Sequence, residues 1–163
     1  RDPELRLMWR VLWIAVAVLL LDQTTKQLAL GQLALHEPVA FAPFLNLTLV
    51  YNKGAAFGFL SSASGWQNAF FIVVALIACG VILYLLRQTR DRLLAVALVL
   101  VLGGAIGNLV DRLIYGYVID FVDVYYQSWH WPAFNVADSA ITIGAILIAF
   151  DAIGIGKSSQ GTG

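Results

Sequence analysis

Long apolar runs separated by short polar segments dominate this chain. The runs predict four helices, at residues about 5–30, 67–86, 93–112 and 134–155. The second run includes eighteen consecutive uncharged residues, 69–86, which would form a helix about 27 Å long at 1.5 Å per residue. A helix of that length crosses the hydrocarbon part of a bilayer. We therefore predict a mainly α membrane protein with four transmembrane helices in a single membrane domain, 1–163.

Two longer segments, 31–66 and 113–133, connect the helices on one side of the predicted bundle. In the first segment, the alternation from Asn46 to Tyr51 predicts a short β element, and Asn52 to Gly54 is a turn signal. The second segment is rich in tyrosine, phenylalanine and tryptophan, which gather at membrane–water interfaces. We expect it to lie on the membrane surface and to act as a lid. The Gly/Ser-rich tail, 156–163, is predicted to be disordered.

The composition supports a membrane location. Hydrophobic residues make up 60% of the chain and charged residues 12%, whereas soluble domains carry about 45–50% apolar and about 25% charged residues. A formal net charge of zero argues against a nucleic-acid partner. The single cysteine, Cys79, excludes an internal disulfide and a cysteine-cluster metal site. His36 and His130 lack the helical spacing of zinc peptidases, so we expect neither a metal nor an organic cofactor.

The distribution of basic residues predicts the orientation in the membrane. Four spans place both chain ends on one side, where seven Lys and Arg residues lie against three on the other side. The seven are Arg1, Arg6, Arg10, Arg87, Arg90, Arg92 and Lys157, and the three are Lys26, Lys53 and Arg112. By the positive-inside rule, both termini are cytoplasmic and the polar candidates lie at the outer face. The first apolar run is longer than a signal-peptide core, so we expect it to be a retained transmembrane helix.

Two aspartates stand out as candidates for chemistry. Asp138 lies at the head of the last apolar run, where Asn135 is a plausible N-cap, and Asp120 lies in the aromatic segment before it. Asp138 could equally be an acid that stabilises the helix N-terminus, and Asp120 alone could be a surface acid. Two carboxylates that share a site do not both ionise easily, so one holds a proton while the other acts as a base. Such a pair can activate water against a peptide carbonyl.

Further polar residues fall at the same predicted face. Asp22 and Lys26 are spaced i,i+4 on one helix and can form an ion pair. Asn108, Asp111 and Arg112 share one face at the end of the third helix. Because ionisable residues at membrane depth are costly, they are more often functional than incidental.

From the residues alone, several interpretations stay open. The acids could relay protons in a small proton-coupled transporter, or the chain could be a purely structural four-helix membrane protein. A Ser–Lys pair of Ser139 with Lys26 is also compatible with the pattern. All the candidate acids except Asp151 lie at one predicted face, which argues against a relay, since a relay needs groups spread across the membrane.

Five motif blocks resemble those of the bacterial lipoprotein signal peptidase (signal peptidase II) family, in the same order and over residues about 5–155. The blocks are Leu21 to Lys26, Tyr51 to Phe57, Gly107 to Arg112, Val118 to Phe121 and Phe134 to Ala140. The resemblance implies an aspartic endopeptidase, multi-pass in the bacterial inner membrane, that removes the signal peptide from diacylglyceryl-modified prolipoproteins. Cleavage would fall on the amino side of the lipidated cysteine.

The resemblance also implies roles for individual residues. It makes Asp120 and Asp138 the catalytic pair. The residues expected to shape the site or hold substrate are Asp22, Lys26, Asn52, Gly54, Asn108, Asp111, Arg112 and Asn135. It further implies contact with membrane lipid and inhibition by the cyclic peptide globomycin, and we expect the protein to be a monomer.

Overall fold

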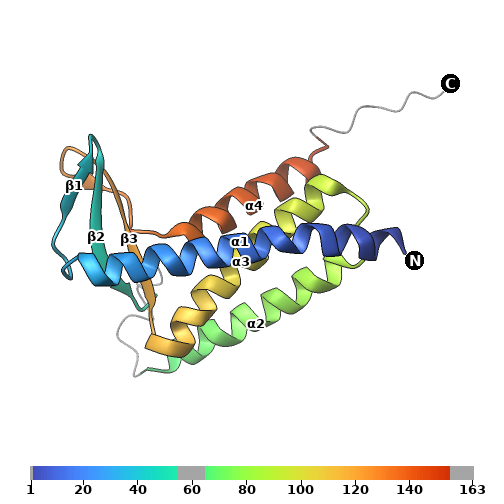
Figure 1. Ribbon diagram of the computed structural model, residues 1–163, viewed down its shortest axis with the longest axis horizontal. Coiled ribbons are helices and arrows are strands. Elements are labelled where there is room, and N and C mark those ends of the chain that lie inside the picture. Colours follow the sequence, from blue (N-terminus) through green and yellow to red (C-terminus); the bar gives the residue numbers. More distant parts are fainter. Residues whose placement is uncertain (1, 55–64, 155–163) are drawn as a thin grey trace.

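Four helices and one small sheet make up the fold of the protein, for which a computed structural model describes residues 2–54 and 65–154. The helices are α1 (Pro3–Gln32), α2 (Trp66–Leu86), α3 (Arg92–Tyr115) and α4 (Val136–Ala152). The strands are β1 (Val39–Ala42), β2 (Leu45–Asn52), β3 (Val118–Tyr126) and β4 (Trp129–His130). The sheet lies at one end of the helices, and α1 begins and α4 ends at the opposite end (Figure 1). The predicted disordered tail, 156–163, lies outside the described residues.

The four predicted helices are present, with shifted ends. The third helix runs to Tyr115 rather than to 112, because Gly116 adopts a left-handed φ of 79° that ends it and its N–H bonds back to the carbonyl of Arg112. The fourth helix starts at Val136 rather than at 134, because Phe134 still pairs with β3 and Asn135 is the N-cap. These shifts matter for the site, because they place Asn135 and Asp138 in the first turn of α4.

Helix α3 is the centre of the bundle and packs against α1, α2 and α4. Its glycines allow the close approach. A methyl group on Gly103 would lie 2.8 Å from the carbonyl oxygen of Ala15 in α1, and one on Gly104 would lie 2.4 Å from that of Ala137 in α4. Contacts this short are not tolerated without moving backbone, so these two positions set the spacing of α1, α3 and α4.

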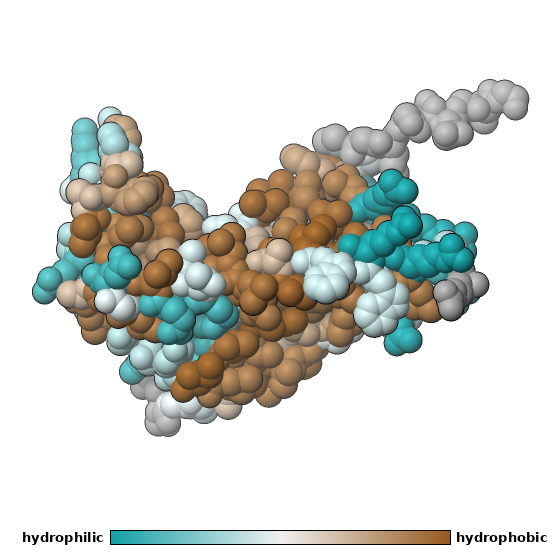
Figure 2. Space-filling view, viewed as in Figure 1, coloured by the Kyte–Doolittle hydropathy of each residue, from teal (hydrophilic) through white to brown (hydrophobic). Residues whose placement is uncertain are grey.

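Two helices, α2 and α3, are long and apolar enough to cross a membrane. Only 11% of the apolar window of α2 is buried, against 50% for α3, so α2 exposes hydrophobic side chains around most of its circumference. Figure 2 shows hydrophobic residues over most of the visible helical surface, with hydrophilic ones gathered near the two ends. The sequence predicts four transmembrane helices, and the structure shows two of them, α2 and α3, to be long and apolar enough to span a bilayer. Helix α4 is shorter, with 17 residues.

The sheet joins the two segments that the sequence placed outside the helices. All strand pairs are antiparallel, in the order β1-β2-β3-β4. Between β2 and β3, Val50 pairs with Asp120 and Leu47 with Val122, so β2 has one more residue than β3 between these pairs. This is a β-bulge, a feature common beside active sites because it re-aims neighbouring side chains.

The expectation of a lid over 113–133 is wrong for the part that contains β3. This strand pairs with β2 from Val118 to Val124, and its residues Val118 to Phe121 are buried. It also carries Asp120 itself. The aromatic segment is therefore part of the scaffold that fixes the carboxylate. The predicted strand around Asn46 to Tyr51 is confirmed as β2.

Candidate active site

Asp120 and Asp138 come together where the sheet meets the helices. Asp120 lies on β3 and is 1% exposed. Asp138 is half-buried in the first turn of α4. The predicted pair is therefore assembled from a strand and a helix whose contact is fixed locally, since the N–H groups of Phe121 and Val122 both bond to the carbonyl oxygen of Phe134.

Asn135 joins the two carboxylates directly. Its side-chain Nδ2 donates to Asp120 Oδ1 at 2.8 Å, and its backbone N–H donates to Asp138 Oδ2 at 3.2 Å. Its Oδ1 accepts the N–H of Asp138 at 2.8 Å, which completes a capping box at the start of α4. The capping geometry and the pairing with Asp120 are thus provided by one buried side chain, and the two interpretations of Asp138 do not compete.

A second asparagine holds each carboxylate from its other side. Asn108 Nδ2 donates to Asp138 Oδ1 at 2.9 Å, and Asn52 Nδ2 donates to Asp120 Oδ2 at 3.0 Å. Asn52 is fixed by a turn in which its Oδ1 accepts the N–H of Gly54 at 2.8 Å. Gly54 has a φ of 102°, and a methyl group there would lie 2.6 Å from the ring of Phe71, so only glycine fits.

Three fully buried charged side chains, Lys26, Asp22 and Asp111, form an ion triad that is connected to the pair through Asn108. Lys26 Nζ lies 2.8 Å from Asp22 Oδ2 and 2.8 Å from Asp111 Oδ2, and all three side chains are 0% exposed. The same Nζ donates to Asn108 Oδ1 at 3.2 Å. Because Asn108 also binds Asp138, the lysine fixes the orientation of the amide that holds this carboxylate.

The two acids of the triad also fix backbone. Asp22 Oδ1 accepts the N–H of Ala137 in α4 at 2.9 Å, and Asp111 Oδ2 accepts the N–H of Ile119 in β3 at 2.9 Å. Each of these N–H groups lies one residue before a member of the candidate pair. The triad therefore tethers α4 and β3 at the positions that carry Asp138 and Asp120.

Gln23 belongs to the same network, although the sequence did not single it out. Its Nε2 donates to Asp22 Oδ2 at 3.2 Å, to Asp111 Oδ1 at 3.0 Å and to the carbonyl oxygen of Gly107 at 3.1 Å. A methyl group at Gly107 would lie 2.5 Å from Asp22 Oδ2, so this glycine is needed for the triad as well as for helix packing. The signal for Gln23 that the sequence offered was an amide side chain close to two charged residues at membrane depth, Asp22 and Lys26.

Arg112 is at the edge of the site. Its guanidinium lies 4.4 Å over the ring of Phe71, and its charge interacts with Asp120, Asp111 and Asp138. Its Nη1 is buried and has no hydrogen-bond partner among the described residues. A cation with a spare donor beside the two carboxylates is suited to an oxygen atom of a ligand.

Burial and a neighbouring charge perturb Asp120. Burial first, and then the charge of Asp138, raises the pKa of Asp120 from 3.8 to about 7. The hydrogen bonds from Asn52 and Asn135 and the charge of Lys26 oppose this rise in pKa. Below about pH 7 the pair therefore retains one proton, which is the ionisation state that a carboxylate pair needs for water activation.

Other polar residues named from the sequence lie elsewhere. Ser139 Oγ donates to the carbonyl oxygen of Asn135 at 3.1 Å, while Lys26 is held by two carboxylates and so is not available as a base. A Ser–Lys pair is thereby excluded. Asp151 lies near the end of α4, opposite to the sheet (Figure 1). Within the described ranges, no group of three or more His, Cys, Asp or Glu side chains could hold a metal.

Two acidic side chains held by one asparagine, on a helical scaffold with apolar spans, are the arrangement expected of a membrane aspartic peptidase. Comparison with known proteins specifies the family. The chain belongs to the signal peptidase II family, whose model, described as signal peptidase (SPase) II, matches residues 14–154. It is thus a bacterial membrane enzyme of the lipoprotein signal peptidases, aspartic peptidases that process prolipoproteins.

Individual relatives agree with this assignment. The chain is 54% identical over 141 residues to a lipoprotein signal peptidase of Burkholderia mallei, covering 86% of this chain and 85% of that one. It is 50% identical over 154 residues to one of Polynucleobacter necessarius, covering 93% and 94%. A solved bacterial membrane enzyme superposes with a TM-score of 0.80 at 34% identity, covering 90% of this chain and 94% of that one. A second reaches a TM-score of 0.82 at 32% identity, with 94% of each covered.

Proposed function

We propose that Asp120 and Asp138 are the catalytic pair of an endopeptidase that cuts diacylglyceryl-modified prolipoproteins on the amino side of the lipidated cysteine. The observation that supports this proposal most strongly is the placement of Asn135, whose side chain and backbone each bind one of the two carboxylates. That arrangement fixes both acids relative to each other without neutralising them. It leaves one carboxylate free to act as a base and the other to donate a proton.

The proposed reaction needs only water and the pair. The ionised carboxylate takes a proton from a water molecule as its oxygen attacks the scissile carbonyl carbon, and the protonated carboxyl donates its hydrogen bond to the developing oxyanion. The tetrahedral intermediate then breaks its C–N bond, and the proton taken from water passes to the leaving amine. The signal peptide leaves as a carboxylic acid and the lipidated cysteine as a free amine. The pair ends with one proton, as it began.

The surroundings of the pair fit a substrate whose ends are held in a membrane. Asn52 and the turn to Gly54 flank Asp120 and would bind the substrate backbone, while Arg112 would bind a carbonyl oxygen with its spare donor. The termini would be cytoplasmic and the pair would lie near the outer face, because the basic residues concentrate at the end opposite to the sheet. All four helices would then span the inner membrane. The enzyme would work as a monomer without a cofactor, and globomycin would block the pair.

Cleavage of a purified precursor tests the function. The chain in detergent is expected to convert a diacylglyceryl-modified prolipoprotein into two products, whose masses place the cut directly before the lipidated cysteine. The matched control is the same precursor without the lipid, which should be cut far more slowly because acyl chains contribute to binding. Equal rates for the two precursors, or a cut at another bond, would contradict the proposal.

The pH dependence of cleavage is a separate prediction. Because the pKa of Asp120 lies at about 7, the rate should fall as pH rises above about 7, where the pair loses its proton. The Asn52→Ala variant loses a hydrogen bond that lowers the pKa of Asp120. The pKa of Asp120 should therefore rise further in this variant, and the fall in rate at alkaline pH should move to higher pH.

The pH profile of kcat/KM measures this shift, with Asn46→Ala as the control. Asn46 lies on the same strand but donates to Asp123 at 3.2 Å, away from the pair. The pH profile of Asn46→Ala should match that of the wild type. Charged groups that act on Asp120 from other elements, Asp138, Lys26 and Arg112, are unchanged in both variants. An Asn52→Ala profile that stayed in place or moved to lower pH would show that this hydrogen bond does not set the pKa.

A further inference from the structure

The end of the molecule opposite to the sheet carries a stripe of alternating charge and aromatic surface on α1. Arg6, Trp9, Arg10 and Trp13 are spaced i, i+3, i+4 and i+7, so they lie on one helix face. Trp9 is 66% exposed and Trp13 is 75% exposed. This stripe takes no part in the candidate active site.

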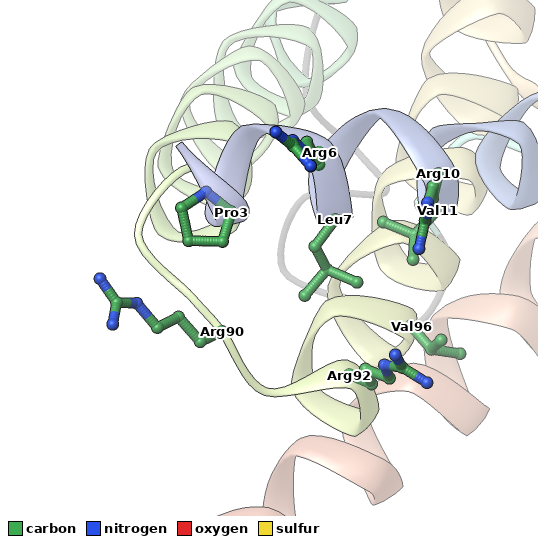
Figure 3. Close-up of a pocket in the computed structure, with 8 residues that line it drawn as sticks. All are labelled: Pro3, Arg6, Leu7, Arg10, Val11, Arg90, Arg92 and Val96. Carbon is green, nitrogen blue, oxygen red and sulfur yellow. The ribbon is translucent and has the colours of Figure 1, made fainter. Parts of the chain in front are cut away.

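The charged residues of the stripe line a hollow of about 520 Å³ between α1 and the start of α3. Its charged lining consists of Arg6, Arg10, Arg90 and Arg92, and its remaining lining is apolar. Figure 3 shows Leu7 pointing into the gap between α1 and the loop before α3, while Arg90 extends away from Arg92. A cationic hollow with an apolar floor is suited to an anion attached to a hydrophobic group.

The nearby acids leave most of this positive charge uncompensated. Arg90 pairs with Glu4, and Asp91 Oδ1 accepts the N–H groups of Leu93 and Leu94 as the N-cap of α3. Asp2 shares an adjoining hollow with Arg6 and Arg10. Within 2–54 and 65–154, no ion pair between a carboxylate and Arg6, Arg10 or Arg92 is present.

An apolar groove continues from the charged surface along the helices. The groove has a volume of about 350 Å³ and lies between α1 and α3, where Trp9, Leu12, Trp13 and Val16 face Leu102 and Ile106. Trp9 also lines the adjoining hollow that Asp2 shares with Arg6 and Arg10, so the charged and apolar surfaces meet at this residue. Basic surface therefore changes to hydrophobic surface along the helix axis, as in the passage from lipid headgroups to acyl chains.

We propose that this surface binds an anionic phospholipid. Arg6 and Arg10 would hold the phosphodiester, because a guanidinium binds phosphate oxygens through two parallel hydrogen bonds. Arg92 would face the rest of the headgroup, and one acyl chain would lie in the groove beside Trp9 and Trp13. Basic pockets between transmembrane helices at the cytoplasmic side are known to suit such headgroups. The site needs this end of the molecule to lie at a membrane face, but it does not depend on the peptidase chemistry.

Native mass spectrometry of the purified full chain, titrated with phosphatidylglycerol, tests the site. The Arg10→Gln variant should bind this lipid about fivefold more weakly, the effect of about 1 kcal/mol for one basic residue near a lipid surface. Arg87→Gln is the matched control, because Arg87 is exposed at the same end, carries the same charge and lies outside the hollow. It should change the affinity less than about twofold. Both variants should cleave lipidated precursor at the wild-type rate, which shows that they are folded.

Further ligands separate the possible sources of binding. Phosphatidylcholine with the same chains should bind more weakly than phosphatidylglycerol, and inorganic phosphate at the same concentration should not displace the lipid. Trp13→Ala should weaken lipid binding as well, because the groove loses one wall. The proposal is overturned if the two arginine variants lose affinity equally, if phosphatidylcholine binds as tightly, or if inorganic phosphate displaces the lipid. If Trp13→Ala bound the lipid as tightly as the wild type, the groove would not be part of the lipid site.

Discussion

Cleavage of a lipidated precursor is expected to fall by about a thousandfold or more when either Asp120 or Asp138 is replaced by asparagine. The substitution keeps the size of the side chain, but it removes the base or the acid of the pair. Because the proposed mechanism uses the two acids as a unit, the double variant should be little worse than either single variant. Folding should survive, since an asparagine at either position can still accept the hydrogen bonds that Asn135 donates.

Single-turnover cleavage and precursor binding, measured on the same preparations, distinguish this result from unfolding. Both variants should bind the lipidated precursor with affinity close to that of the wild type. Asp123→Asn is the matched control on the same strand, because Asp123 bonds to Asn46 and His130 and not to the pair. It should cleave at nearly the wild-type rate. If Asp120→Asn or Asp138→Asn retained a tenth of the wild-type rate, the assignment of the pair would be wrong.

The second large effect is expected at Lys26, whose replacement by methionine should destabilise the protein by about 3–5 kcal/mol. The substitution leaves Asp22 and Asp111 without their shared counter-charge at positions that are 0% exposed. The two acids also hold the N–H groups of Ala137 and Ile119, so their rearrangement would move α4 and β3. Loss of activity should accompany loss of stability, although Lys26 does not contact either candidate acid through a hydrogen bond in the described residues.

Thermal unfolding in detergent measures this effect against Lys53→Met, which removes the same charge from an exposed position. Lys53→Met should leave the melting temperature nearly unchanged. Adding Asp111→Asn to Lys26→Met should restore part of the stability, since only one buried carboxylate then lacks a partner. A melting temperature for Lys26→Met that equalled that of Lys53→Met would show that the triad is not needed for the fold.

The helices could be predicted because their signal is local. An uninterrupted apolar run fixes a helix wherever it occurs, and the glycine at 116 and the asparagine at 135 mark ends that the pattern placed three residues early at 112 and two residues early at 134. The strand around Asn46 was predictable for the same reason, from its alternation. Local signals were therefore sufficient for α1 to α4 and for β2.

Strand β3 could not be predicted, because its signal is not local. From Val118 to Phe121 both faces are buried, so the alternation that marks a half-exposed strand is absent. Its partner, β2, lies about seventy residues earlier in the chain, where Val50 pairs with Asp120. A dense run of aromatic residues is equally typical of a membrane interface, and this led to the expectation of a lid.

The candidate site was predictable in its members but not in its connections. Motif resemblance named both aspartates and all the asparagines of the network. It did not show that Asn135 binds both carboxylates, that Lys26 is shared by two acids, or that Gln23 donates to both acids of the triad. These contacts join residues from α1, α3, β3 and α4, and they depend on the close helix approach that Gly104 and Gly107 permit.

The central claim is that one water molecule, and later one oxygen of the tetrahedral intermediate, bridges Asp120 and Asp138. An experimental structure of the wild-type chain bound to a lipidated peptide, with a hydroxyl in place of the scissile carbonyl, measures this directly. We predict that the hydroxyl oxygen lies within hydrogen-bond distance of a carboxylate oxygen of each aspartate, with Asn135 still bound to both. Carboxylates too far apart for one oxygen to reach both, with the peptide in place, would contradict the mechanism.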